Sequence, residues 1–159
     1  MRSTTCLITY LLLAPSFIAR AADPKTAVFW SATQLKEADK KLPPKINPEL
    51  HLATERLMDS AFILHRDGPS TAEIHDDQAD FIVIREGEGA LLIGTQGTKL
   101  VEGKRTGPGE QRGAAVEGGT KYPVTAGDMI YVPANTPHQF LVDPGKHFTA
   151  VIVKVTPKQ

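Results

Sequence analysis

The sequence predicts a small all-β domain, a barrel or a sandwich, that follows a short N-terminal arm with one helix. The length of 159 residues supports one domain with a hydrophobic core and leaves no room for a second sizeable one. From His51 onward, short apolar runs alternate with segments rich in glycine and proline. Runs of this length and spacing are typical of a β-sandwich or a β-barrel.

The first 21 residues have the features of a secretory signal peptide. Arg2 precedes an apolar stretch at 6–14, and Ala19-Arg-Ala21 forms a small-x-small cleavage site before Ala22. The apolar stretch is shorter than the roughly 20 residues that span a bilayer. We therefore expect a secreted or periplasmic protein with no membrane attachment after cleavage. Cleavage also removes Cys6, the single cysteine, which excludes a disulfide and cysteine-based catalysis in the processed chain.

A short helix is predicted next. Ser31 and Gln34 have the spacing of a capping box, in which the two side chains satisfy the first free amides of a helix. The helix should run to about Leu42, because Pro43 and Pro44 cannot continue it. We divide the chain into a signal peptide (1–21), an N-terminal arm with this helix (22–58) and a β-domain (59–159).

The β-domain contains a series of strand-like runs, at 52–57, 61–64, 72–75, 81–84, 90–93, 129–132, 139–142 and 148–155. Gly87-Glu-Gly89 fits a tight hairpin between two of them. The segment 101–113 is rich in glycine and charge, and it is either a mobile loop over one end of the barrel or a solvated hairpin insertion. Arg105 and Arg112 in this segment are either partners for an anionic substrate or solvated surface charges.

Four residues form the candidate metal site. Glu73 and His75 are two apart in an extended run, so that both side chains point to one face of a strand. Asp80 opens the next run after a short turn at 76–78, and His138 begins a distant strand. Taken singly, Glu73 could be a surface carboxylate, Asp80 could cap a turn, and His138 could be a core histidine. Taken together, two imidazoles and two carboxylates suit a hard or borderline divalent metal ion.

The other histidines lack this support. His65 shares a face with Ile63 and is expected to be packed, or to lie behind the metal ligands, and His147 follows a turn and should be exposed. Tyr131 and Phe140 alternate in phase with the presumed inward face. They are therefore candidates to line a pocket, or equally to form part of the aromatic core.

These residues and their spacing resemble the two motifs of the cupins. The first motif is matched by Gly68, Glu73-Ile-His75, Asp80 and Gly87, and the second by the segment from Gly127 through Pro133 to His138. The resemblance covers about 61–155. The chain departs from the usual pattern at four positions: Glu73 replaces a histidine, Asp80 a glutamate, Asn135 a glycine and Val142 an asparagine. The glutamate and the aspartate can still bind a divalent cation.

The resemblance implies a double-stranded β-helix, or jelly-roll barrel, that binds manganese, iron, nickel or zinc. It implies a metal-dependent dioxygenase, isomerase, decarboxylase or lyase that acts on a small oxygenated substrate, or alternatively a non-catalytic small-molecule-binding or structural protein. His75, Asp80 and His138 would be metal ligands, and Glu73 either the fourth ligand or a general base. Cupins are often dimers, so the resemblance also implies a homodimer. Positive and negative formal charges balance at 18 each, and no nucleic-acid partner is expected.

Overall fold

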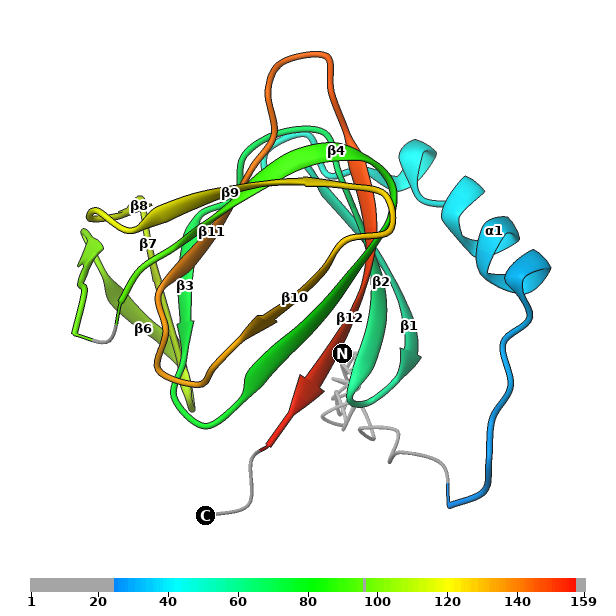
Figure 1. The fold of residues 1–159 in the computed structure, drawn as a ribbon, viewed down its shortest axis with the longest axis horizontal. Helices are drawn as coiled ribbons and strands as arrows, with labels where there is room; N and C mark the ends of the chain where they lie inside the picture. Colours follow the sequence, from blue (N-terminus) through cyan, green and yellow to red (C-terminus); the bar gives the residue numbers. More distant parts are fainter. Residues whose placement is uncertain (1–24, 96, 157–159) are drawn as a thin grey trace, which may run out of the picture.

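The structure, a computed structural model, describes residues 25–95 and 97–156, so the predicted signal peptide lies outside the described residues. Figure 1 shows antiparallel strands that curl around an interior, with a single short helix on the outside. The prediction of an all-β fold with a short helix is confirmed. Within the described part of the chain, no helix has the length and apolar character to cross a membrane.

The elements are, in chain order, α1 (Ala32–Lys40), a 3-10 helix (Pro43–Lys45), β1 (Leu52–Met58), β2 (Ala61–Arg66), β3 (Ala72–His75), β4 (Ala79–Ile93), β5 (Leu100–Val101), β6 (Lys104–Gly107), β7 (Glu110–Gly113), β8 (Ala115–Val116), β9 (Thr120–Thr125), β10 (Met129–Val132), β11 (His138–Leu141) and β12 (Phe148–Val155). The main sheet has the order β1-β2-β12-β4-β11-β3-β7-β6, and β9 and β10 also pair with β4. Every predicted strand overlaps one of these strands.

The predicted hairpin at 87–89 is wrong, because Ala79–Ile93 is one continuous strand, β4. The first part of β4 pairs with β10 and β12, and the second part pairs with β9 and β11. Gly87 has φ +77 and lies beside a register irregularity between β4 and β12. A bulge and a tight turn both need a residue that tolerates positive φ. The glycine therefore marks the point where β4 bends from one side of the barrel to the other.

Alternating residues of the strands fill the barrel. In β12, Phe148, Ala150 and Ile152 are buried in the main core cluster, whereas Val151 packs on the opposite face against a second cluster. The same alternation in β2 points Phe62 and Leu64 toward the main core. Because the side-chain period of a strand is two, the next residue in phase on each strand also faces the interior.

The N-terminal helix packs on the outer face of the sheet. Ser31 and Gln34 form the predicted capping box at the start of α1. Leu42 is fully buried against Ala53 and Ile63, on the side of β2 that faces away from the barrel interior. This packing leaves the inside of the barrel free for the polar residues described next.

The segment 101–113 forms a hairpin, as one of the two alternatives predicted. Strands β6 and β7 pair with each other, and β7 also pairs with β3. The hairpin therefore extends the main sheet, and Arg112 on β7 lies directly opposite Glu73 on β3.

Candidate metal centre

The four predicted ligands meet inside the barrel, although they come from three different strands. Glu73 and His75 lie on β3, Asp80 on β4, and His138 opposite Glu73 at the start of β11. One potential ligand atom from each side chain lies within 4.8 Å of those of the others. The sequence thus predicted the proximity of these residues correctly. Their role as metal ligands remains a prediction.

The turn before β11 fixes the position of His138. Asn135 has φ 58, a left-handed conformation that asparagine adopts more readily than most residues. Its backbone N–H donates a hydrogen bond of 2.8 Å to the carbonyl of His75. Asparagine can therefore replace the glycine of the usual motif, and the turn connects the two histidine-bearing strands directly.

The donor atoms have the spacing expected around one ion. His138 Nε2 lies 3.3 Å from Glu73 Oε1 and 3.3 Å from Asp80 Oδ2. His75 Nε2 lies 3.5 Å from Asp80 Oδ2 and 4.0 Å from Glu73 Oε1. Adjacent ligands that bind one ion at about 2.0–2.2 Å are separated by roughly 3–3.5 Å. Three of these pairs are thus close to the spacing around one ion, whereas His75 and Glu73 must approach each other for a single ion to bind all four side chains.

The tautomer of His138 supports the same conclusion. Its Nδ1 donates a hydrogen bond of 3.0 Å to the carbonyl of Thr136, so the neutral ring has its lone pair on Nε2. The ring is 1% exposed, and Nε2 has no hydrogen-bond partner among the described residues. A buried lone pair that faces two carboxylates is unfavourable unless a proton or a cation lies between them. A hydrogen bond from the other ring nitrogen to a carbonyl is also typical of metal-binding histidines.

Without a metal ion, a proton takes this place. Burial alone would lower the pKa of His138, but the carboxylates of Asp80 and Glu73 outweigh it and raise the pKa to about 9. Burial raises the pKa of Glu73, and the stronger attraction of His138 and Arg112 lowers it to about 2. The pKa of Asp80 is also lowered, because His138, His75 and Lys154 outweigh the effect of its burial. The cluster therefore attracts positive charge.

Lys154 is a residue of the site that the sequence analysis missed. It lies opposite Asp80 in the pairing of β12 with β4, and its Nζ is 2.6 Å from Asp80 Oδ1. The same ammonium group donates a hydrogen bond of 2.6 Å to His75 Nε2. The alternation Phe148, Ala150, Ile152 continues to Lys154 and could have placed it on the inward face. A metal ion that binds His75 Nε2 must displace this ammonium group.

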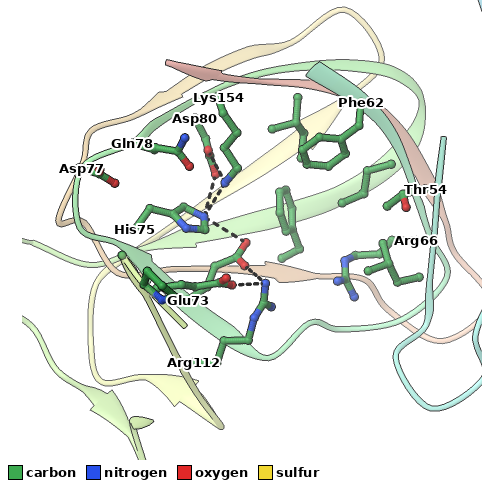
Figure 2. Close-up of a pocket in the computed structure, with 17 residues that line it drawn as sticks. Thr54, Phe62, Arg66, Glu73, His75, Asp77, Gln78, Asp80, Arg112 and Lys154 are labelled. Carbon is green, nitrogen blue, oxygen red and sulfur yellow. Dashed lines mark hydrogen bonds and ion pairs between the residues drawn. The ribbon is translucent and has the colours of Figure 1, made fainter. Parts of the chain in front are cut away.

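A cavity of about 320 Å³ adjoins the cluster, and Figure 2 shows its lining. Glu73, His75, Asp80 and Lys154 form one polar end of it. The side chain of Arg112 reaches in from β7 and forms an ion pair of 2.8 Å with Glu73 Oε2. The cavity is large enough for a small organic molecule beside the cluster.

Other candidate residues lie in different environments. Phe140 is buried and lines the cavity, whereas Tyr131 is 53% exposed, so its predicted place in the cavity or core is wrong. His65 is packed on the other face of β2, where its Nδ1 lies 2.8 Å from Thr149 Oγ1. His147 is exposed, as predicted. Arg105 forms an ion pair of 2.6 Å with Asp76.

No protein-family model and no curated protein matches the sequence. Solved structures with the same architecture do match. The protein TT1209 from Thermus thermophilus is 15% identical with a TM-score of 0.51, over 74% of this chain and 92% of that one. A Klebsiella pneumoniae protein with a double-stranded β-helix domain is 14% identical with a TM-score of 0.50, over 82% and 91%. The polyketide cyclase RemF from Streptomyces resistomycificus is 18% identical with a TM-score of 0.46, over 71% of this chain and 74% of that one. The chain therefore has the double-stranded β-helix fold of the cupins, with a His/Glu/Asp cluster that could hold a metal ion.

Proposed function

We propose that this protein binds one divalent transition-metal ion through Glu73, His75, Asp80 and His138, and that it acts on a small oxygenated molecule in the adjoining cavity. The observation that carries the proposal is the position of His138 Nε2, which is buried without a hydrogen-bond partner among the described residues and lies 3.3 Å from each of two carboxylates. Two nitrogen and two oxygen donors suit manganese, iron, nickel or zinc. The bound ion would supply Lewis-acid chemistry toward an oxygen atom of the substrate.

Glu73 serves as a ligand in this proposal. Arg112 and His138 hold its carboxylate in the ionised form, with a pKa of about 2. A group with so low a pKa accepts a proton poorly at neutral pH, because the best general bases have pKa values near the working pH. Arg112 orients the carboxylate through an ion pair on Oε2, which leaves Oε1 toward the two histidines.

The same pKa favours a second candidate, a protein that binds its ligand without turnover. His138 and Arg112 hold Glu73 ionised, so this carboxylate is a poor general base. A binding protein would be stabilised by its ligand through mass action. Incubation with a panel of small hydroxy and oxo acids separates the two functions: an enzyme consumes one of them in an NMR assay, whereas a binder shows a raised Tm and an unchanged NMR spectrum of the acid.

The proposal also includes export from the cytoplasm, on the basis of the signal-peptide features at 1–21. Expression of the full chain in a Gram-negative host, followed by N-terminal sequencing of the periplasmic protein, tests this point. We expect the processed chain to begin at Ala22. A full-length chain confined to the cytoplasm would contradict export and leave the metal site unaffected.

The metal site is tested by titration of the metal-free protein with Mn²⁺, Fe²⁺, Ni²⁺ and Zn²⁺, monitored by calorimetry. We expect one tight site in the unaltered protein. His138→Ala and Asp80→Ala should each weaken binding by at least the roughly 10–100-fold that follows loss of a supporting group around a metal. His147→Ala, which removes an exposed histidine, is the matched control and should bind as the unaltered protein does. Full affinity in both site variants would refute the proposal.

A further inference from the structure

The cavity contains a buried positive charge that forms no ion pair with a carboxylate in the described part of the chain. Arg66, the last residue of β2, is 5% exposed and lines the cavity. Its guanidinium makes one hydrogen bond among the described residues, from Nη1 to the carbonyl of Leu50 at 3.1 Å. Its Nε is buried without a hydrogen-bond partner. Figure 2 shows the guanidinium directed into the cavity, across from Glu73 and Arg112.

This arrangement differs from that of the other described arginines. Each of these forms an ion pair with a carboxylate: Arg56 with Asp59, Arg85 with Asp39, Arg105 with Asp76, and Arg112 with Glu73 and Glu110. All of them are more exposed than Arg66. A buried charge is rarely left unpaired, because its transfer from water is costly. The burial lowers the pKa of Arg66, which reflects this cost. An anion from outside the chain would offset it.

Apolar side chains line the cavity beside Arg66. The Arg66 guanidinium carbon lies 5.9 Å from the centre of the Phe140 ring, and the same ring packs edge-on against His138 with 6.5 Å between ring centres. Phe140 therefore separates the guanidinium from the metal cluster. Phe62, Leu64 and Ile152 also line the cavity. The cavity thus has a cationic end at Arg66, an apolar wall and a polar end at the cluster.

The charges of the cavity also favour a single negative charge on the ligand. Its lining includes three cationic side chains and four acidic ones, so a divalent ion bound at the cluster by neutral histidines gives the cavity one excess positive charge. A monoanion would then complete the neutralisation, and Arg66 is the cation of the cavity that forms no ion pair among the described residues.

We propose that Arg66 binds the carboxylate of a small monocarboxylic acid, whose apolar body lies along Phe140 and whose other end reaches the metal cluster. A planar guanidinium matches a carboxylate through two parallel hydrogen bonds. Of the two guanidiniums that line the cavity, Arg112 is already paired with Glu73 and Glu110, so Arg66 alone is available to an anion. One available guanidinium suits a carboxylate better than a phosphate dianion, which needs more donors. The orientation toward the cluster rests on the proposed function, whereas the contact between Arg66 and the carboxylate does not.

The experiment compares hexanoate with hexanamide, which have nearly the same shape and differ in charge. Each is titrated into the metal-free protein, and binding is measured by NMR. We expect hexanoate to bind at least tenfold more tightly than hexanamide. The preference should disappear in Arg66→Gln and persist in Arg105→Gln, which changes an exposed arginine outside the cavity. Arg66→Lys, which keeps the charge and loses the planar fork, should retain part of the preference.

A measurement on the unaltered protein covers the case in which Arg66→Gln fails to fold. The Nε–H resonance of Arg66, assigned by its absence in Arg66→Lys, should shift with hexanoate and not with hexanamide. Equal affinities for the two probes, a preference that survives in Arg66→Gln, or tighter binding of inorganic phosphate than of hexanoate would overturn the inference. A protein that prefers hexanoate and binds no metal would retain the Arg66 site and refute the proposed metal function. A protein that binds metal but shows no preference for hexanoate would refute the Arg66 site and retain the proposed metal function.

Discussion

The raised pKa of His138 makes the stability of the metal-free protein depend on pH. In the metal-free protein the folded-state pKa is about 9, above the ordinary value of 6.5. The resulting stabilisation is fully present below about 6.5 and is lost as the pH rises through 9. The folded-state pKa of Glu73 is about 2, below its ordinary 4.5, so its stabilisation is present above 4.5 and is lost as the pH falls through 2. With chelator present, the free energy of unfolding should therefore decrease from pH 6.5 to 9.5.

Urea denaturation at a series of pH values measures this decrease. His138→Gln is the informative variant, because glutamine has no titratable group and its amide can still donate a hydrogen bond toward the two carboxylates. The variant should lose the decrease between pH 6.5 and 9.5. An identical decrease in the variant would show that another group titrates and that the raised pKa of His138 is incorrect.

Lys154 occupies the site as a competing cation. Its ammonium group contacts Asp80 and His75, so metal binding must displace it. Hydrogen bonds to charged groups contribute about 1.5–3 kcal/mol, and 1.4 kcal/mol corresponds to tenfold in affinity. We therefore expect Lys154→Met to tighten metal binding by about tenfold or more and to destabilise the metal-free protein.

Calorimetric titration of Lys154→Met measures this change, and Lys146→Met is the control. Lys146 also forms an ion pair, with Glu88, but it is exposed and does not line the cavity beside the cluster. The control should leave the metal affinity unchanged. Weaker metal binding in Lys154→Met would show that the lysine supports the ligands, contrary to the competition that we propose.

The chemistry of single residues explains which parts of the site could be predicted. Glu73, His75, Asp80 and His138 stand out in the sequence because histidine and acidic residues interrupt apolar strands at a recognisable spacing. Lys154 and Arg66 follow the same alternation, but they lie at strand ends, where a basic residue is usually solvated. The alternation alone could have placed them on the inward face, and the pairing of β12 with β4 and β2 shows that both lie there.

At the scale of elements, the bend of β4 depends on Gly87. Its φ is +77, and a Cβ at this position would lie 2.0 Å from the carbonyl oxygen of His147. A left-handed conformation costs about 1–2 kcal/mol for residues other than glycine. Gly87→Ala should cost more than this, because the backbone of 147 would also have to move.

Gly145→Ala provides a matched control for this effect. Gly145 has φ +79, but no atom lies within 4 Å of a Cβ built there. The control therefore measures the cost of the backbone conformation alone. Urea denaturation should show a clearly larger loss for Gly87→Ala than for Gly145→Ala. Equal losses would mean that the close approach of the backbone at 147 to Gly87 is not maintained.

Strands could be predicted well where the alternation of apolar and polar residues is strong. They were predicted poorly where a glycine fits either a turn or a bulge. The runs 61–64, 72–75, 129–132 and 148–155 all lie in strands. Gly87 and Gly89 suggested a hairpin because a turn and a bulge share the same backbone requirement. Tyr131 was assigned to the wrong face, because alternation defines two faces of a strand and does not identify the inner one. The pairing of β10 with β4, in which Tyr131 lies opposite Phe81, determines which face of β10 points inward.

At the scale of the whole molecule, the barrel is what assembles the site. The cluster draws on β3, β4, β11 and β12, and β12 lies next to β4 although residues 94–147 separate them in the chain. Figure 1 shows these strands on the wall of one curled sheet. The unfolded chain has no such arrangement, so metal binding should be coupled to folding and should stabilise the native state.

The most direct test of the central claim is anomalous X-ray scattering from crystals of the protein grown with Mn²⁺ or Zn²⁺. The account predicts one strong peak among His75, His138, Glu73 and Asp80, at about 2.0–2.3 Å from their nitrogen and oxygen atoms, with Lys154 moved away from His75. A cluster without a peak under these conditions, or an ion bound elsewhere with Lys154 still between Asp80 and His75, would contradict the proposed metal centre.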